Sequence, residues 1–120
     1  MASTLQKQII VGALSLIEKE ENWTRGVLAQ TREGERCSWR DVHATKFCAV
    51  GAVGHAAAAL VRHYGHALEL AMAAARSIAA SNDQPGWCLS SINDTEGHAV
   101  IVQMFRTALE KWEKPPSEAS

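Results

Sequence analysis

The sequence predicts a compact, mainly α-helical single domain with four principal helices and an irregular segment or small hairpin after the first helix. The chain of 120 residues is close to the commonest size of one domain. Hydrophobic residues make up 47% of it and charged residues 21%, which is typical of globular proteins. Apolar residues recur at helical spacing near both ends, and the middle is rich in alanine. We expect one domain over residues 1–113 and a disordered tail over 114–120.

The first helix is predicted over residues 4–21, with Ser3 or Thr4 as its N-cap. The stretch that follows, NWTRGVLAQTREGERCSW, contains a polar turn at 32–34 that joins two short extended pieces. Trp23 and Trp39 flank this stretch, and we expect them to cover one end of the core. The apolar face of the first helix consists of Leu5, Ile9, Ala13, Leu16 and Ile17.

A second helix is predicted to begin between Ser38 and Thr45, with Ser38, Asp41 or Thr45 as N-cap, and to run to about His63. Its stretch FCAVGAVGHAAAAL is apolar or small on every side, which is typical of a helix surrounded by protein. The glycines and alanines then allow close approach of neighbouring helices. Gly65 ends this helix, so His63 and His66 would lie at its C-terminus, where the dipole favours positive charge.

Two further helices complete the predicted fold. The third is expected over about residues 67–81. The last begins at Asn93, which has capping-box spacing to Glu96, and Asp94 favours the positive end of the helix dipole. One apolar stripe marks this last helix: Ile101, Phe105, Leu109 and Trp112.

Charge and motifs exclude several classes of function. A net charge of −1, spread along the chain, offers no basic face for nucleic acid and no polybasic anchor for a membrane. The start, MASTLQKQII, lacks the regions of a signal peptide, so we expect a cytoplasmic protein with reduced cysteines. The chain contains no phosphate-binding glycine loop and no GxSxG elbow, and we expect no cofactor.

Cys48 is the candidate nucleophile of a Cys-dependent hydrolase or transferase. If Thr45 caps the second helix, Cys48 lies in its first turn, where backbone N–H groups and the dipole lower a thiol pKa. His55 lies about 10.5 Å farther along that helix and is too distant to act as the base. His98 or His43 would have to serve, with Asn93 or Asp94 as the orienting group. The alternative is that Cys48 is a small buried apolar residue.

Two other groups of polar residues have a structural and a functional interpretation. Asn93, Asp94 and His98 could receive an anion or a carbonyl at a helix N-terminus, but capping alone accounts for the first two. A metal site would need Cys and His residues from separate segments, because no pair has the close spacing of a zinc motif.

Three segments together resemble a known family: NWTRG near residue 22, FCAVGA at 47–52, and INDTEGH at 92–98. The chain resembles a family of small uncharacterised bacterial and phage proteins that show Trp-x-x-Gly, Trp-Cys-x-x-Gly-Ala and Trp-Asn-Asp motifs. Here Phe47 and Ile92 stand where that family usually has tryptophan. The resemblance covers roughly residues 5–112 and implies an architecture, an origin in phage or another mobile element, and no assigned activity.

The leading functional hypothesis is a small cytoplasmic protein-interaction module that binds a protein partner or itself. Apolar residues left outside the core would mark the contact surface, and Trp87, Leu89 and Trp112 are the candidates. The rival hypothesis is the Cys-dependent enzyme with Cys48 as nucleophile and His98 as base.

Overall fold

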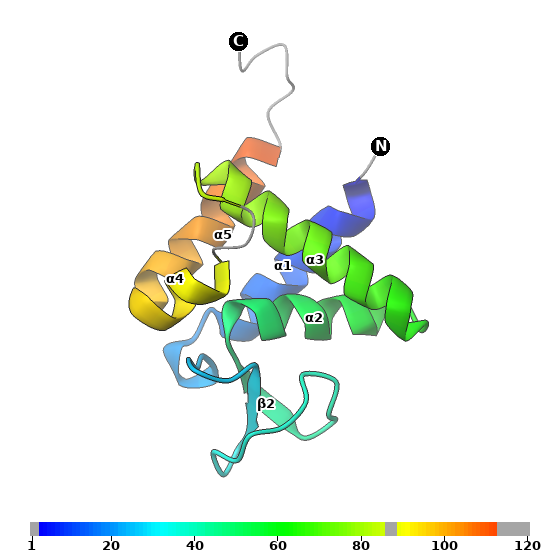
Figure 1. Ribbon diagram of the computed structural model, residues 1–120, viewed down its shortest axis with the longest axis vertical. Helices are drawn as coiled ribbons and strands as arrows, with labels where there is room; N and C mark the ends of the chain where they lie inside the picture. Colours follow the sequence, from blue (N-terminus) through cyan, green and yellow to red (C-terminus); the bar gives the residue numbers. More distant parts are fainter. Residues whose placement is uncertain (1–2, 86–88, 113–120) are drawn as a thin grey trace.

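The computed structural model describes residues 3–85 and 89–112, and this part of the chain is mainly helical. It contains five α-helices, one short 3₁₀ helix and a two-stranded antiparallel sheet, so the predicted class is confirmed while the prediction of four helices is wrong. Figure 1 shows the helices packed on one another, with the strands beyond them on the side of α2. In chain order the elements are α1 (Ser3–Ile17), η1 (Glu20–Asn22), β1 (Ala29–Thr31), β2 (Ala44–Phe47), α2 (Ala49–Leu60), α3 (Tyr64–Ser81), α4 (Leu89–Thr95) and α5 (His98–Trp112).

Helix α2 occupies the middle of the fold, as its composition predicts. It packs against α1 and against α3, and in Figure 1 α1 runs behind the other two helices. Most of its residues are buried, because only alanine, glycine and valine side chains fit between closely packed neighbours. The buried members are Ala49, Gly51, Ala52, Val53, Gly54, Ala56 and Ala57.

The amphipathic first and last helices supply the larger side chains of the core. Helix α1 buries Ile9, Ala13 and Ile17, and α5 buries Ile101 and Phe105, all of them with no exposed surface. Leu109 and Trp112 are partly buried against the same core. The predicted apolar faces are therefore confirmed, although α1 ends at Ile17, four residues before the predicted end.

Two glycines of α2 leave room for non-helical segments that pack directly against the helix. A Cβ on Gly51 would lie 1.9 Å from the carbonyl oxygen of Leu28, and a Cβ on Gly54 would lie 2.8 Å from the Trp39 indole. Neither distance is possible for a real side chain. The sequence predicted that these glycines allow close approach of neighbouring helices, but at both positions the close neighbour is a non-helical segment, at Leu28 and at Trp39.

The predicted polar turn is present, and the strand pairing extends beyond it. The N–H of Gly34 donates to the carbonyl of Thr31 at 2.9 Å, and Gln30 bridges Arg36 across this turn. Gly34 has φ +89°, a conformation that glycine adopts without strain. Strand β1 pairs with β2 in antiparallel register, with Ala29 opposite Phe47 and an irregularity after Gln30.

Strand β2 lies where the sequence predicts the start of the second helix. The hydroxyl of Ser38 accepts from the N–H of Arg40 at 3.0 Å, and the carboxylate of Asp41 accepts from the N–H of His43 at 2.8 Å. Both side chains therefore stabilise local turns instead of capping a helix. The helix begins only after Cys48, which is its actual N-cap.

The boundary between α2 and α3 also differs from the prediction. Helix α2 ends at Leu60 and α3 begins at Tyr64, so Gly65 does not end a helix. The Nδ1 atom of His63 accepts from the N–H of His66 at 3.2 Å and caps the N-terminus of α3. The predicted C-terminal role of these two histidines is wrong.

The predicted last helix is two helices. Helix α4 ends at Thr95 and α5 begins at His98, with the break at residues 96–97. Asn93 lies inside α4 and has no exposed surface, so the predicted capping role of Asn93 and Asp94 is wrong. Trp87, Cys88 and the tail at 114–120 lie outside the described residues.

Candidate functional site

The three segments that carry the family resemblance meet at the side chain of Asn93. Its Oδ1 accepts hydrogen bonds from Trp23 Nε1 at 2.7 Å and from the N–H of Ala49 at 2.9 Å. Its Nδ2 donates to the carbonyl of Thr24 at 3.1 Å and to the Asp94 carboxylate at 3.2 Å. Both acceptor and both donor positions of the amide are used. We call these five residues, Trp23, Thr24, Ala49, Asn93 and Asp94, the Asn93 clasp.

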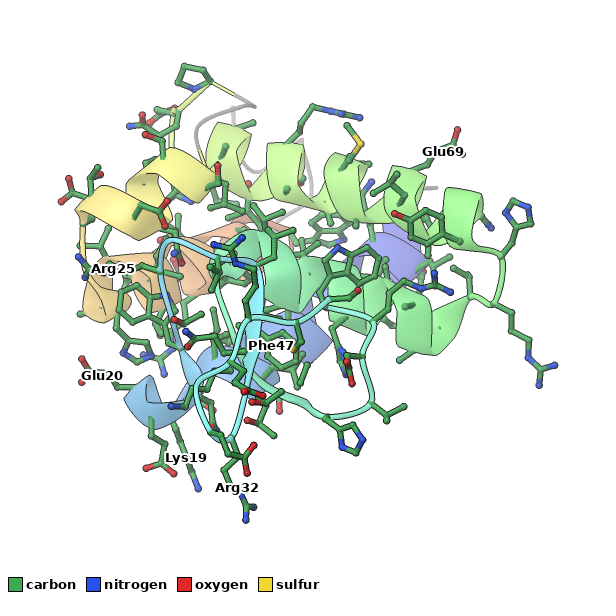
Figure 2. All side chains as sticks on the ribbon, turned by 60° about the horizontal axis from the view of Figure 1, so that its bottom comes forward. Lys19, Glu20, Arg25, Arg32, Phe47 and Glu69 are labelled. Carbon is green, nitrogen blue, oxygen red and sulfur yellow. The ribbon has the colours of Figure 1, made fainter. Side chains whose placement is uncertain are left out.

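Further contacts hold the segment at residues 24–26 on α4. The N–H of Gly26 donates to the Asp94 carboxylate at 2.9 Å. The guanidinium of Arg25 donates to the carbonyls of Asp94 and Glu96, both at 3.4 Å, and lies over the Trp23 ring. Arg25 is labelled in Figure 2, where it lies beside α4. The clasp therefore joins three distant segments of the chain through hydrogen bonds that partner every polar atom of the buried amide.

His98 lies at the edge of the clasp and binds a helix end. Its Nε2 lies 2.6 Å from the carbonyl oxygen of Ile17, the last residue of α1. A carbonyl only accepts, so Nε2 carries the hydrogen. The imidazole also packs beside Trp23, with ring centroids 5.6 Å apart.

Cys48 is buried at the start of α2, with 3% of its surface exposed. Its Sγ accepts from the N–H of Gly51 at 3.3 Å, and its own N–H donates to the carbonyl of Leu28 at 3.2 Å. Burial raises the pKa of the Cys48 thiol above its ordinary value, and the Asp94 carboxylate raises this pKa further. The backbone N–H groups at the helix start oppose this shift in pKa without reversing it.

The structure thus brings Asn93, Asp94 and His98 together through Trp23, with Cys48 next in sequence to the clasp residue Ala49. No hydrogen bond joins Cys48 to His98, although both residues lie in the described part of the chain. A buried thiol with a raised pKa is protonated at neutral pH, which suits a structural residue. The catalytic pairing of Cys48 with His98 stays a prediction.

The described residues were also compared with what a metal site and a membrane-spanning helix require. Within residues 3–85 and 89–112, no three His, Cys, Asp or Glu side chains gather in an arrangement that would hold a metal ion. Of the helices described, none combines the length and the hydrophobicity needed to cross a bilayer.

The sequence interpretation missed an exposed apolar stripe on α3. Tyr64, Leu68 and Met72 recur every four residues and are 47%, 37% and 52% exposed. The alanines of the same helix face the core, including Ala67, Ala71 and Ala74. The spacing at i, i+4 and i+8 is present in the sequence. The prediction considered only the alanine-rich face, which packs on the core, and left the opposite face of the helix out. Leu89, proposed for a contact surface, is 1% exposed and belongs to the core.

Fold and site together define a small, mainly helical protein in which three distant segments are fastened by one buried amide. The chain belongs to the family of unknown function DUF6197, which matches it over residues 1–111. The predicted resemblance to an uncharacterised family is confirmed. No curated protein and no solved structure matches the chain.

Proposed function

We propose that the protein is an interaction module and that the outer face of α3 is its contact surface. The exposed stripe of Tyr64, Leu68 and Met72 supports this proposal, because a helix face without a covering neighbour usually keeps polar residues there. The stripe runs about 12 Å along the helix. Glu69, labelled in Figure 2, projects outward from the same helix and provides a polar rim.

One end of the stripe is already ordered. The ring of Tyr64 stacks on Trp39, with centroids 6.0 Å apart and an interplanar angle of 18°. The guanidinium of Arg40 lies 4.5 Å from the centroid of the same ring. A side chain held in this way loses less conformational freedom when a partner covers it, so binding costs less entropy.

The partner we propose is a second copy of the chain, with the two α3 helices antiparallel. Tyr64 and Met72 lie at equal sequence distances on either side of Leu68. A two-fold axis at Leu68 therefore places Tyr64 of each copy opposite Met72 of the other. An interface made by one helix from each copy is small, and we expect weak, reversible dimers.

The experiment measures association by sedimentation over a range of protein concentrations. We expect the wild type to dimerise and Leu68→Glu to stay monomeric, because the dimer would bury two uncompensated carboxylates. The matched control is Val100→Glu, an apolar-to-acidic change at a residue of α5 that is 42% exposed. This control should dimerise like the wild type.

A cross-link tests the position of the axis. Leu68→Cys should form an intermolecular disulfide on mild oxidation, since the two introduced thiols would lie beside the axis. Val100→Cys is the control for random collision. A wild type that stays monomeric at every concentration, or equal cross-linking of the two variants, would contradict the proposed dimer.

The cytoplasmic location and a phage or mobile-element origin stay predictions.

A further inference from the structure

Two adjoining hollows lie beside α2, and they share Leu16 and His55 as walls. The first, of about 330 Å³, lies between α1 and α2 and is almost wholly apolar. The second, of about 520 Å³, lies between the end of α1, the 3₁₀ helix and β2, and its lining is about half polar and half apolar, with the charged side chains of Glu21, Arg32 and Lys46 among it. Together they form a groove whose two halves differ in chemistry, which we call the apolar arm and the polar arm.

Small side chains create the apolar arm. Gly12 of α1 lies over Ala56 of α2, so that an added Cβ on the glycine would be 3.4 Å from the alanine Cβ. The other walls of the arm include Ala59 and Leu60, and the leucine is 44% exposed. Along α1 the arm extends from Gln8 to Leu16, a distance of about 12 Å.

The polar arm holds charged groups that the protein itself does not neutralise. Arg32 and Lys46 line it, and neither makes a hydrogen bond or ion pair with another residue in the described part of the chain. Glu21, which also lines this arm, has no such partner either. The three charges leave a net charge of +1. In Figure 2, Arg32 projects from the tip of its turn, while Phe47 lies inside the molecule and forms an apolar wall.

His55 is fixed at the junction of the two arms. Its Nδ1 lies 2.7 Å from the carbonyl oxygen of Trp39, so this nitrogen carries the hydrogen. The imidazole packs against Phe47, with ring centroids 4.8 Å apart. Its Nε2 has no hydrogen-bond partner among the residues that the structure describes. The junction thus presents an oriented, unused polar atom between an apolar half and a cationic half.

We propose that this groove binds a small amphiphilic anion that is monomeric in solution: an alkyl carboxylate. Its chain lies in the apolar arm, and its head group meets Arg32 and Lys46. The length of the apolar arm fits a chain of medium length better than a peptide, which would need a longer groove. The groove is lined by α1, η1, β2, α2 and the turn at Arg32, and by no member of the α3 stripe, so this proposal does not rest on the proposed dimer.

Calorimetric titration with sodium octanoate, below its micelle concentration, tests both halves of the ligand. We expect saturable binding of octanoate and about fourfold weaker binding for each methylene removed, because each buried methylene adds to the affinity. Octanol, with the same chain and no charge, should bind on the order of five-fold more weakly, and acetate should not bind.

Two variants separate the arms, each with a matched control. Ala59→Leu fills the apolar arm from an exposed helical position and should abolish octanoate binding, while Ala80→Leu, on exposed α3 surface, should not. Lys46→Gln should weaken octanoate by about fivefold and leave octanol unchanged, while Arg36→Gln should affect neither. Circular dichroism of the variants confirms that the fold is kept.

Several results would overturn the proposal. Equal affinity for octanoate and octanol would show that the cations do not recognise the head group. Equal effects of Ala59→Leu and Ala80→Leu would place the binding elsewhere. Binding to octanoate micelles or anionic vesicles without binding to monomeric octanoate would indicate a membrane surface as the partner.

Discussion

At the scale of single residues, Asn93 shows how a buried polar side chain is made compatible with a small core. It is the one polar side chain in the described residues that is fully buried. Its four hydrogen bonds replace those that the amide would make with water. Two of these bonds also satisfy donors of other segments, Trp23 Nε1 and the N–H of Ala49 at the start of α2, which otherwise would lack a partner.

Replacing Asn93 should therefore lower the free energy of unfolding by more than the net contribution of its four hydrogen bonds. We expect Asn93→Ala to lower the free energy of unfolding by about 3 kcal/mol, because it leaves buried donors unsatisfied and opens a cavity. Denaturation in urea measures this change. Asn22→Ala is the control: the side chain of Asn22 makes no hydrogen bond within the described part of the chain, and its loss should cost less than about 0.5 kcal/mol. Equal losses for the two variants would show that the amide network does not stabilise the fold.

Cys48 makes stability depend on pH at the alkaline end. Since burial raises the pKa of this thiol in the folded state, the folded protein keeps the proton at a pH where the unfolded chain has lost it. The resulting stability is complete below the unfolded pKa of about 8.5 and is lost as pH rises from there through the folded pKa. We expect the free energy of unfolding to fall less steeply above pH 8.5 in Cys48→Ala than in the wild type.

Alkylation gives a second measurement on the same thiol. Iodoacetamide should modify Cys37, which is partly exposed, well before Cys48, and peptide mapping distinguishes the two. Rapid modification of Cys48 in the folded protein near neutral pH would contradict a structural role and would favour the hydrolase or transferase hypothesis.

At the scale of elements, the start of α2 shows why helix boundaries were harder to predict than helices. Ser38 and Asp41 have the spacing of a capping box, yet each stabilises a turn next to it in the chain. The strand that follows forms because Phe47 pairs with Ala29 across the sheet, a contact between segments that the local sequence does not reveal. Local periodicity predicts that a helix exists, while the neighbours it meets decide where it begins.

The tight contact at Gly51 gives a test of this element. Gly51→Ala places a Cβ against the carbonyl of Leu28, a backbone atom that moves only with its whole segment. We expect the free energy of unfolding to fall by about 3 kcal/mol, measured in urea. Gly97→Ala is the matched control, because nothing lies within 4 Å of its added Cβ and its backbone has no positive φ. That change should be neutral or slightly stabilising.

At the scale of the whole molecule, the sequence predicted the features that a single helix determines by itself, such as which of its faces is buried. The buried faces of α1 and α5 and the enclosed α2 followed from residue spacing and side-chain size. The candidate site was predicted only in part: the importance of Asn93 and Asp94 was anticipated, but their side chains reach a segment nearly seventy residues away. The groove beside His55 left no signal in the sequence, since its walls come from four separate elements.

The Asn93 clasp also bears on how the chain reaches its final state. Trp23 and Asn93 are 70 residues apart in sequence, and Ala49 is 44 residues from the same amide. During synthesis, the first half of the chain therefore leaves the ribosome without the group that completes it. Contacts that close such long loops form late, because the loss of chain entropy comes before the gain from the contact. Until α4 is formed, Trp23, Thr24 and the start of α2 lack the Asn93 side chain that joins them, so the last quarter of the chain completes contacts of its first half.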